Sequence, residues 1–173
     1  MQKTSNKTRA LVAALTLSAA AFGTWQANEG FTTGAVIPTK GDVPTIGHGS
    51  TRYEDGSLVR MGETITRQRA AQLARNLMAA DERVFAASLP AGTTLYQAEY
   101  DVYLDFIGQY GISSWRASSM RKEVVAGNYV AACSALLRYR YAAGYDCSTP
   151  GNKRCLGVWR RQLERHDKCM AAQ

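Results

Sequence analysis

The sequence predicts an α+β protein in which a small β-hairpin lobe precedes a larger helical lobe, with a cleft between the two lobes. Two observations predict this class. The β-prone runs are confined to the first third of the chain, and apolar residues recur at helical spacing from residue 66 onward. A chain of 173 residues is long enough for one compact domain, or one domain with two lobes, to bury a hydrophobic core.

The chain begins with a positively charged region followed by an uncharged stretch, which is typical of an export signal. The uncharged stretch covers residues 10–28 and is rich in Ala rather than in Leu, Ile or Phe. The preceding charges are Lys3, Lys7 and Arg9.

Two fates of this segment remain open. Ala19–Ala21 offers a small-residue cleavage site, so the segment could be a removed signal peptide. Alternatively it stays attached as a weak membrane anchor, because its length approaches the roughly 20 residues that span a bilayer. We therefore expect a signal or signal-anchor segment at residues 1–27 and a folded domain at residues 28–173.

A small hairpin is expected next. Ala35–Pro38 and Val43–Tyr53 are short β-prone runs, and Lys40–Asp42 forms a turn signal between them. Glu54–Ser57 marks a second turn.

Helical spacing begins near Thr66 and predicts a helix that ends near Pro90. A second helix is expected over Leu95–Ile107, stopped by Gly108 and Gly111. The apolar stripe of the first helix, at spacings of four, three and four, is Leu73, Leu77, Ala80 and Val84.

Three shorter helices are expected in the remainder of the chain. Ser114 can cap one that runs through Val125, and Asn128 can cap the next. The last runs from about Leu156 to Cys169.

The four cysteines all lie in the last quarter of the chain, and an even number in an exported protein predicts disulfides. Three pairings are possible. We favour Cys147–Cys155, which closes a short loop, and Cys133–Cys169, which ties two helices together. The absence of a CxxC motif argues against a zinc site, so we expect no metal and no cofactor.

The net charge of +7 favours an anionic partner such as nucleic acid, a membrane surface or an acidic cell envelope. From Arg138 onward, the chain contains eight basic residues and three acidic ones. This segment is either a solvated face or a surface that steers the protein towards anions. An exported chain rarely meets nucleic acid, so we expect no nucleic-acid partner.

Candidate chemistry begins at Glu29, directly after the uncharged stretch and at an expected helix end. Downstream, Thr45, Gly47 and Gly49 would share one face of an extended strand and leave a flat floor on which a bulky substrate could approach the backbone. Glycoside hydrolysis commonly uses one protonated and one ionised carboxyl group.

Glu29 could be the protonated group, crowded by Trp25 and Phe31, and Asp42 the ionised one. Thr45 could help to hold a water molecule for an inverting reaction. Each residue also has an ordinary structural interpretation: a solvated helix end, a turn residue and a strand former.

The residues together resemble the phage-lysozyme family of glycoside hydrolases, which includes T4-type and lambdoid endolysins. The resemblance rests on Glu29–Gly30 followed by the block Pro44–Gly49, in a family pattern of Glu, then Asp, then Thr. It extends from about Trp25 to Cys169. Further matching segments are Phe106–Gly111, Ser118–Met120, Ala126–Asn128 and Gly157–Glu164.

The sequence departs from the family pattern at the second carboxylate. The family's Asp falls on Thr39, and the nearest carboxylate is Asp42, which we favour for that role. By resemblance, Gly47, Gly49 and Gln109 contact substrate. His48 is expected to contact substrate as a wall of the cleft rather than to act as a base.

The resemblance implies a lysozyme-like fold, and it implies cleavage of the β-1,4 bond between N-acetylmuramic acid and N-acetylglucosamine in peptidoglycan. It is strongest to signal-anchor-release endolysins, which are tethered to the inner membrane, act with a holin or pinholin, and become active in the host periplasm on release. We expect a monomer. The first 26 residues lack cysteine, so release by thiol exchange is not expected. A different class of function also fits: a secreted, non-catalytic module that binds peptidoglycan or the envelope.

Overall fold

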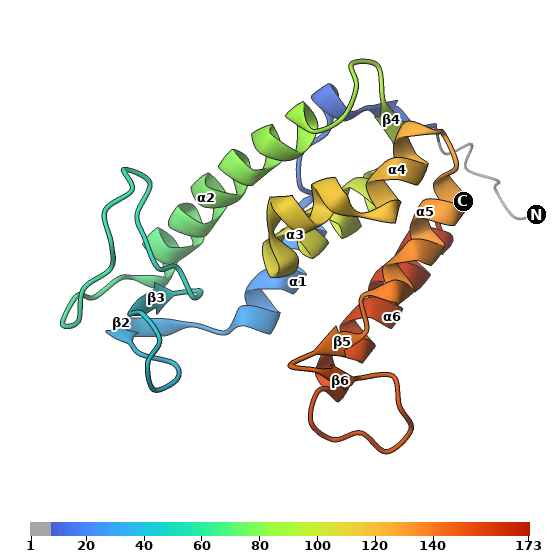
Figure 1. Ribbon diagram of the computed structural model, residues 1–173. Coiled ribbons are helices and arrows are strands. Elements are labelled where there is room, and N and C mark those ends of the chain that lie inside the picture. Colours follow the sequence, from blue (N-terminus) through green and yellow to red (C-terminus); the bar gives the residue numbers. More distant parts are fainter. Residues whose placement is uncertain (1–7) are drawn as a thin grey trace, which may run out of the picture. The chain divides into compact units, whose positions relative to one another are not determined.

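The computed structural model describes residues 8–173, which form two compact units (Figure 1). The hairpin unit comprises residues 16–84. The helical unit comprises residues 85–173 together with the preceding segment 8–15. Lys3 and Lys7 of the expected export signal lie outside the described residues.

The hairpin unit contains helix α1 (Ala19–Glu29), strands β2 (Thr32–Val36) and β3 (Thr45–Gly47), and most of helix α2 (Arg67–Ala87). The strands pair antiparallel, which confirms the expected hairpin around the turn at residues 40–42. The first turn of α1 is capped by Ser18, whose hydroxyl accepts a hydrogen bond from the amide of Ala21.

A small apolar core lies between the hairpin, the loop that follows it and α2. Ile46 and Leu73 are completely buried at its centre, and Phe31, Tyr53 and Leu77 pack against it. Its buried residues are Ala35, Ile46, Val59, Ile65, Ala70 and Leu73. The core thus holds β3 against the first half of α2.

The loop after the hairpin is fastened to α2 by a polar contact. The guanidinium of Arg69 donates two hydrogen bonds of 2.7 Å to the carboxylate of Glu54, and the side-chain amide of Asn76 donates a third. These bonds to Arg69 and Asn76 lower the pKa of Glu54 to about 2. The turn predicted over Glu54–Ser57 therefore marks an anchored loop.

The helical unit is mostly α-helix, with two short strand pairings among its described residues. Strand β1 pairs antiparallel with β4, and β5 with β6. Its elements in chain order are β1 (Ala10–Leu11), the 3-10 helix η1 (Val12–Ala14), β4 (Thr94–Leu95), α3 (Gln97–Ala117), α4 (Ser119–Val125), α5 (Tyr129–Ala135), the 3-10 helix η2 (Leu136–Arg138), β5 (Tyr141–Ala142), β6 (Tyr145–Asp146) and α6 (Leu156–Met170).

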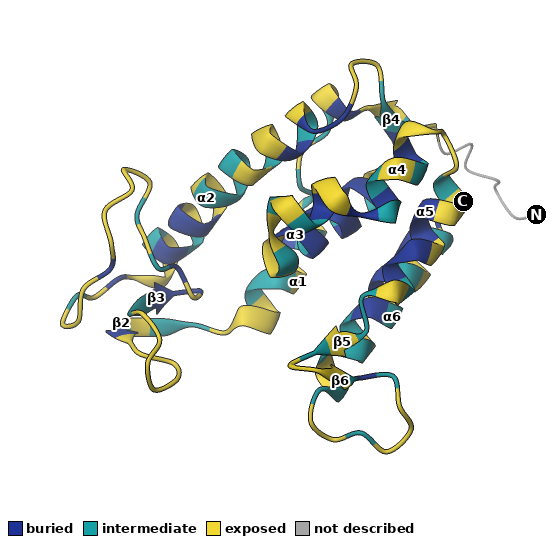
Figure 2. Cartoon of the chain, viewed as in Figure 1, coloured by how far each residue is buried: buried dark blue, intermediate teal, exposed yellow. Residues whose placement is uncertain are grey.

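Aromatic rings form the core of the helical unit, and the buried faces of α3, α5 and α6 are visible in Figure 2. Trp115 lies between Phe85 and Tyr103, with ring centroids 5.1 and 5.0 Å away. Its indole N–H donates a 2.8 Å hydrogen bond to the hydroxyl of Ser88. The aromatic cluster therefore carries no unsatisfied indole donor.

Both favoured disulfides are confirmed: Cys133–Cys169 joins α5 to α6, and Cys147–Cys155 closes the loop before α6. A partly buried ion pair adds to this cohesion. Asp105 on α3 accepts hydrogen bonds of 2.6 Å from both Arg161 and Arg165 on α6. Burial opposes the charge of Asp105, yet the two guanidinium groups hold its pKa below the ordinary value.

Two helix boundaries differ from the prediction. Helix α3 does not stop at Gly108; it continues to Ala117 with a kink at Gly111, whose φ is 80°. Ser114 lies inside α3 and donates to the carbonyl of Tyr110, so the cap of the next helix is Ser118 instead. A serine hydroxyl can donate to the carbonyl four residues earlier and so remain inside a helix. The prediction of Ser114 as a cap did not consider this possibility.

The first and last predicted helices are confirmed as α2 and α6, although the apolar stripe of α2 ends on buried Phe85 rather than on exposed Val84. The α+β class with a small hairpin part and a larger helical part is likewise confirmed, and the cleft stays a prediction. Among residues 8–173, no helix has the length and apolar character needed to cross a membrane.

Candidate active site

Glu29 is the last residue of α1. The next residue, Gly30, ends the helix with a φ of 72°, a conformation that glycine adopts without the strain of other residues. Glu29 is solvent-exposed. The carboxyl group therefore stands at an exposed helix end rather than in a closed pocket.

The structure brings Glu29 together with the glycine block that follows the hairpin strand. A methyl group built onto Gly49 would lie 4.0 Å from Oε2 of Glu29, so the backbone of Gly49 is close to the carboxylate. These residues are separated by twenty positions in sequence, and the hairpin brings them together. This juxtaposition is the central feature of the candidate site.

His48 connects the block to both sides of Glu29. Its Nδ1 donates a hydrogen bond to the carbonyl oxygen of Gly30, because a carbonyl can only accept. Its Nε2 lies 3.3 Å from the side-chain amide nitrogen of Gln26, within hydrogen-bonding distance. The imidazole thus bridges the residue after Glu29 and a residue one turn before it.

Two aromatic rings pack against this imidazole. The centroids of Trp25 and Phe31 lie 5.9 and 5.6 Å from that of His48, which is only 5% exposed. The expected crowding of Glu29 by these rings is wrong, because they enclose His48 and leave the carboxyl exposed. His48 is a buried support of the helix end in this structure, and its contact with substrate stays a prediction.

Gly47 has a packing role that the prediction of an open floor missed. It is buried with a φ of 65°, and a methyl group at this position would stand 2.7 Å from Cβ of Ala70 on α2. The close approach of strand and helix therefore requires glycine here. Thr45 begins β3 and is partly exposed, and its hydroxyl donates a long 3.4 Å bond to the carbonyl of Val36.

Asp42 and Thr39, the two candidates for the second position in the family pattern, share one exposed turn between β2 and β3. The amide of Asp42 donates a 2.9 Å hydrogen bond to the carbonyl oxygen of Thr39. Gln109 belongs to the helical unit, where it is exposed on α3. The structure thus groups Glu29, His48 and Gly49, and it keeps Asp42 at the tip of the same hairpin.

Gln26 is a site residue that sequence reasoning missed. It lies four positions before Gly30 on the same face of α1, so the helical period alone places it beside the turn that Glu29 begins. The signal that could have identified Gln26 is a side-chain amide four positions before the glycine that ends the helix.

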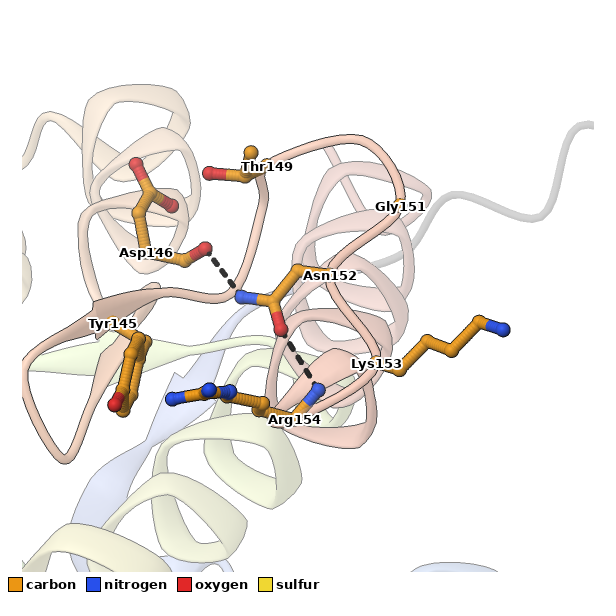
Figure 3. Close-up of a pocket in the computed structure, with 7 residues that line it drawn as sticks. All are labelled: Tyr145, Asp146, Thr149, Gly151, Asn152, Lys153 and Arg154. Atoms are coloured by element: carbon orange, nitrogen blue, oxygen red, sulfur yellow. Dashed lines mark hydrogen bonds between the residues drawn. The ribbon is translucent and has the colours of Figure 1, made fainter.

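The helical unit has a separate hollow of roughly 460 Å³ on the loop closed by Cys147–Cys155 (Figure 3). None of the predicted catalytic residues lines it. In the part of the chain that the structure describes, no three His, Cys, Asp or Glu side chains are grouped so that they could hold a metal ion.

Comparisons with known proteins cover most of the chain. Residues 26–164 match the sequence model described as phage lysozyme. The endolysin of Salmonella phage P22 is 32% identical over 100 residues, which are 58% of this chain and 67% of that protein.

Solved structures show the same fold. A point mutant of the P22 lysozyme superposes with a TM-score of 0.72 at 24% identity, over 90% of this chain and 99% of the other. The endolysin of Escherichia coli O157:H7 phage FAHEc1 gives 0.70 at 26% identity, over 92% and 96%. The muramidase domain of SpmX from Asticaccaulis excentricus gives 0.70 at 19% identity, over 90% and 97%.

Proposed function

From the premise that this chain belongs to the phage lysozyme family and is a glycoside hydrolase of the lysozyme type, we propose that it is an endolysin. Its substrate is the β-1,4 bond between N-acetylmuramic acid and N-acetylglucosamine in peptidoglycan, and its cleavage causes host lysis. The observation that carries this proposal is the Glu29 carboxyl group at an exposed helix end, beside the backbone of Gly49.

Glu29 acts as the general acid. It donates its proton to the glycosidic oxygen as the bond to the leaving sugar breaks. Because the carboxyl is exposed, a glycan strand can reach it directly. The flat backbone at Gly49 leaves room for a sugar ring to approach that carboxyl closely.

The second carboxylate in this proposal is Asp42. Its place in the exposed hairpin turn leaves it available to stabilise positive charge on the sugar or to activate water. Thr45, at the start of β3, helps to hold that water. Thr39 occupies the family position in the sequence but has no ionisable group, so it is the weaker candidate.

The decisive experiment is hydrolysis of purified sacculi by Glu29→Gln, which removes the acidic proton while keeping the side-chain shape. We expect the rate to fall about a hundred- to ten-thousand-fold, with sacculus binding and fold retained. A non-catalytic binding module would lose nothing. Mass analysis of the fragments released by the wild type names the bond, and products of amide cleavage would contradict the muramidase assignment.

Two further variants assign the second carboxylate. Asp42→Asn is expected to lower the rate strongly, and Thr39→Ala is the matched change within the same turn, expected to lower it little. A near wild-type rate for Asp42→Asn would remove Asp42 from the mechanism.

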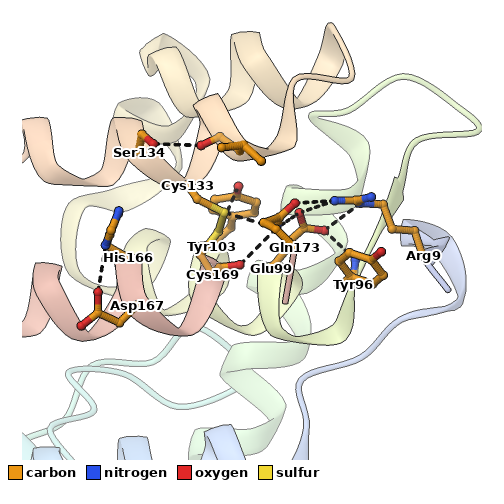
Figure 4. Close-up of a disulfide and its surroundings, with 11 residues drawn as sticks. Arg9, Tyr96, Glu99, Tyr103, Cys133, Ser134, His166, Asp167, Cys169 and Gln173 are labelled. Carbon is orange, nitrogen blue, oxygen red and sulfur yellow. Dashed lines mark hydrogen bonds and ion pairs between the residues drawn. A yellow bond between two sulfur atoms is a disulfide. The ribbon is translucent and has the colours of Figure 1, made fainter. Parts of the chain in front are cut away.

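The N-terminal segment is folded onto the helical unit through Arg9 (Figure 4). Its guanidinium donates two 3.2 Å hydrogen bonds to the completely buried carboxylate of Glu99. It also lies over the rings of Tyr96 and Tyr129, at 4.0 and 3.7 Å from their centroids. Gln173 accepts a third hydrogen bond from Arg9 and donates one to Glu99.

We propose that this packed arrangement is the released state of a signal anchor. In the tethered state, Arg9 would remain with the other N-terminal charges on the cytoplasmic side of the inner membrane, while the folded domain enters the periplasm. The same segment cannot then occupy its place beside Glu99. Release, triggered when a holin or pinholin depolarises or perforates the membrane, would let Arg9 reach Glu99 and would free α1, which ends in Glu29.

Fractionation of cells before and after membrane depolarisation tests this proposal. We expect the full-length chain in the membrane fraction first and in the soluble periplasmic fraction afterwards, with Met1 intact by mass analysis. A chain that is soluble throughout and lacks its first residues would show cleavage of a signal peptide instead.

A further inference from the structure

The loop closed by Cys147–Cys155 has a fixed shape built from its own polar groups. The Asp146 carboxylate accepts hydrogen bonds from the amide and the hydroxyl of Ser148, at 3.0 and 2.6 Å. The side chain of Asn152 donates to the carbonyl of Asp146 and accepts from the amide of Arg154, both at 2.8 Å. A loop that is already ordered binds a ligand without a large further loss of conformational entropy.

This loop presents positive charge that has no anionic partner among the described residues. Among residues 8–173, neither Lys153 nor Arg154 forms an ion pair, and both are exposed. The nearby carboxylate of Asp146 is already engaged by hydrogen bonds from Ser148 and by the ion pair with Arg140, which lower its pKa. Figure 3 shows that this carboxylate points away from the guanidinium of Arg154.

An aromatic ring completes the site. The guanidinium of Arg154 lies 4.5 Å from the ring centroid of Tyr145, which is 44% exposed. Together with Asn152 and Thr149, these groups line the hollow of roughly 460 Å³. A planar guanidinium can bind a carboxylate through two parallel hydrogen bonds, and an exposed ring offers a flat apolar face beside it.

We propose that this hollow, on the helical unit, is a second, non-catalytic binding site for a carboxylate-bearing peptide stem of peptidoglycan. The inference rests on the proposed function, because that function brings the protein to a polymer that repeats such stems along each glycan strand. Arg154 binds the carboxylate, and Tyr145 and Asn152 contact the peptide beside it. The side chain of Lys153 points away from the Arg154 guanidinium (Figure 3), so its charge attracts the stem without contacting the same carboxylate. Binding at this site keeps the enzyme on the sacculus between cleavage events.

Binding by the full chain carrying Glu29→Gln tests the site without hydrolysis. The variant pair is Lys153→Ala with Arg154→Ala, and the matched control is Arg160→Ala with Lys168→Ala, which removes the same charge from exposed positions of α6. The probes are a soluble disaccharide-tetrapeptide, intact sacculi, and glycan strands stripped of their stems by an amidase.

We expect the loop pair to weaken binding of the tetrapeptide probe and of sacculi by about tenfold, and the control pair by much less. On stem-free strands the two pairs should behave alike. Equal losses from both pairs would overturn the proposal in favour of general charge attraction. Equal or tighter binding of phosphatidylglycerol vesicles or an oligonucleotide through the loop would overturn it in favour of another polyanion.

A failure of the proposed function gives a different result. If the wild-type chain does not cleave sacculi but the loop pair still loses stem binding, the muramidase proposal fails and the binding site stands.

Discussion

The two units of this protein are stabilised in different ways. The helical unit has two disulfides, an aromatic core around Trp115, and ion pairs at Asp105 and Glu99. The hairpin unit has no disulfide within its residues; a small apolar core and the exposed Glu54–Arg69 pair hold it. The group proposed to donate the proton, Glu29, lies in the more lightly braced unit.

The strongest stabilising contacts and the proposed proton donor therefore lie in different units. A catalytic carboxyl at an exposed helix end needs precise local support but not a large core, and His48 supplies that support with two hydrogen bonds. The two disulfides of the helical unit restrict the unfolded chain and so stabilise this unit. Each prediction below tests one side of this contrast.

The largest expected effect is on the helical unit. Replacing Cys133 and Cys169 by Ser should cost roughly 4 kcal/mol of unfolding free energy, because the bond closes 36 positions of chain. The Cys147–Cys155 bond closes only 8 positions of chain, so the matched pair Cys147→Ser with Cys155→Ser should cost roughly 2.5 kcal/mol. Denaturant unfolding followed by circular dichroism measures both, and equal losses would contradict the chain-entropy explanation.

A somewhat smaller loss is expected from Arg9→Ala, which leaves the Glu99 carboxylate buried without a cation and should cost roughly 3 kcal/mol. Adding Glu99→Gln removes the isolated charge and should recover part of the loss. The double-mutant cycle reports the coupling in thermal unfolding. If Arg9→Ala alone is neutral, the N-terminal segment does not stabilise the helical unit.

The smallest effect should fall on catalysis and not on stability of the helical unit. His48→Ala removes the support on both sides of Glu29 and should lower kcat about tenfold with little change in KM. His48→Asn keeps a donor for the Gly30 carbonyl and should recover part of the rate. If the Asn variant is no better than the Ala variant, the hydrogen bond to Gly30 does not position the acid.

Much of the fold could be predicted because its signals are local. The apolar period gives α2 and α6, the turn at Lys40–Asp42 gives the hairpin, and cysteine spacing favours the observed pairs. The kink at Gly111 could not be distinguished from a helix stop, since glycine is compatible with both and only the packing of the following turn selects one.

The site was predicted less completely because its contacts are not local. The resemblance assigned Glu29 and Gly49 to one candidate site, whereas the buried role of His48 depends on Trp25 and Phe31 packing around its ring. Gly47 was misread for the same reason: its close neighbour, Ala70, belongs to a helix that begins twenty residues later.

The placement of the aromatic rings also gives each unit its own spectroscopic label. Trp25 is the hairpin unit's indole, whereas Trp115 and Trp159 belong to the helical unit. A protein that keeps Trp25 and carries Phe at the other two positions would report by fluorescence on the neighbourhood of Glu29 alone. Trp115, which is buried in the core and hydrogen-bonded to Ser88, would show the blue-shifted emission of a buried indole until the helical unit unfolds.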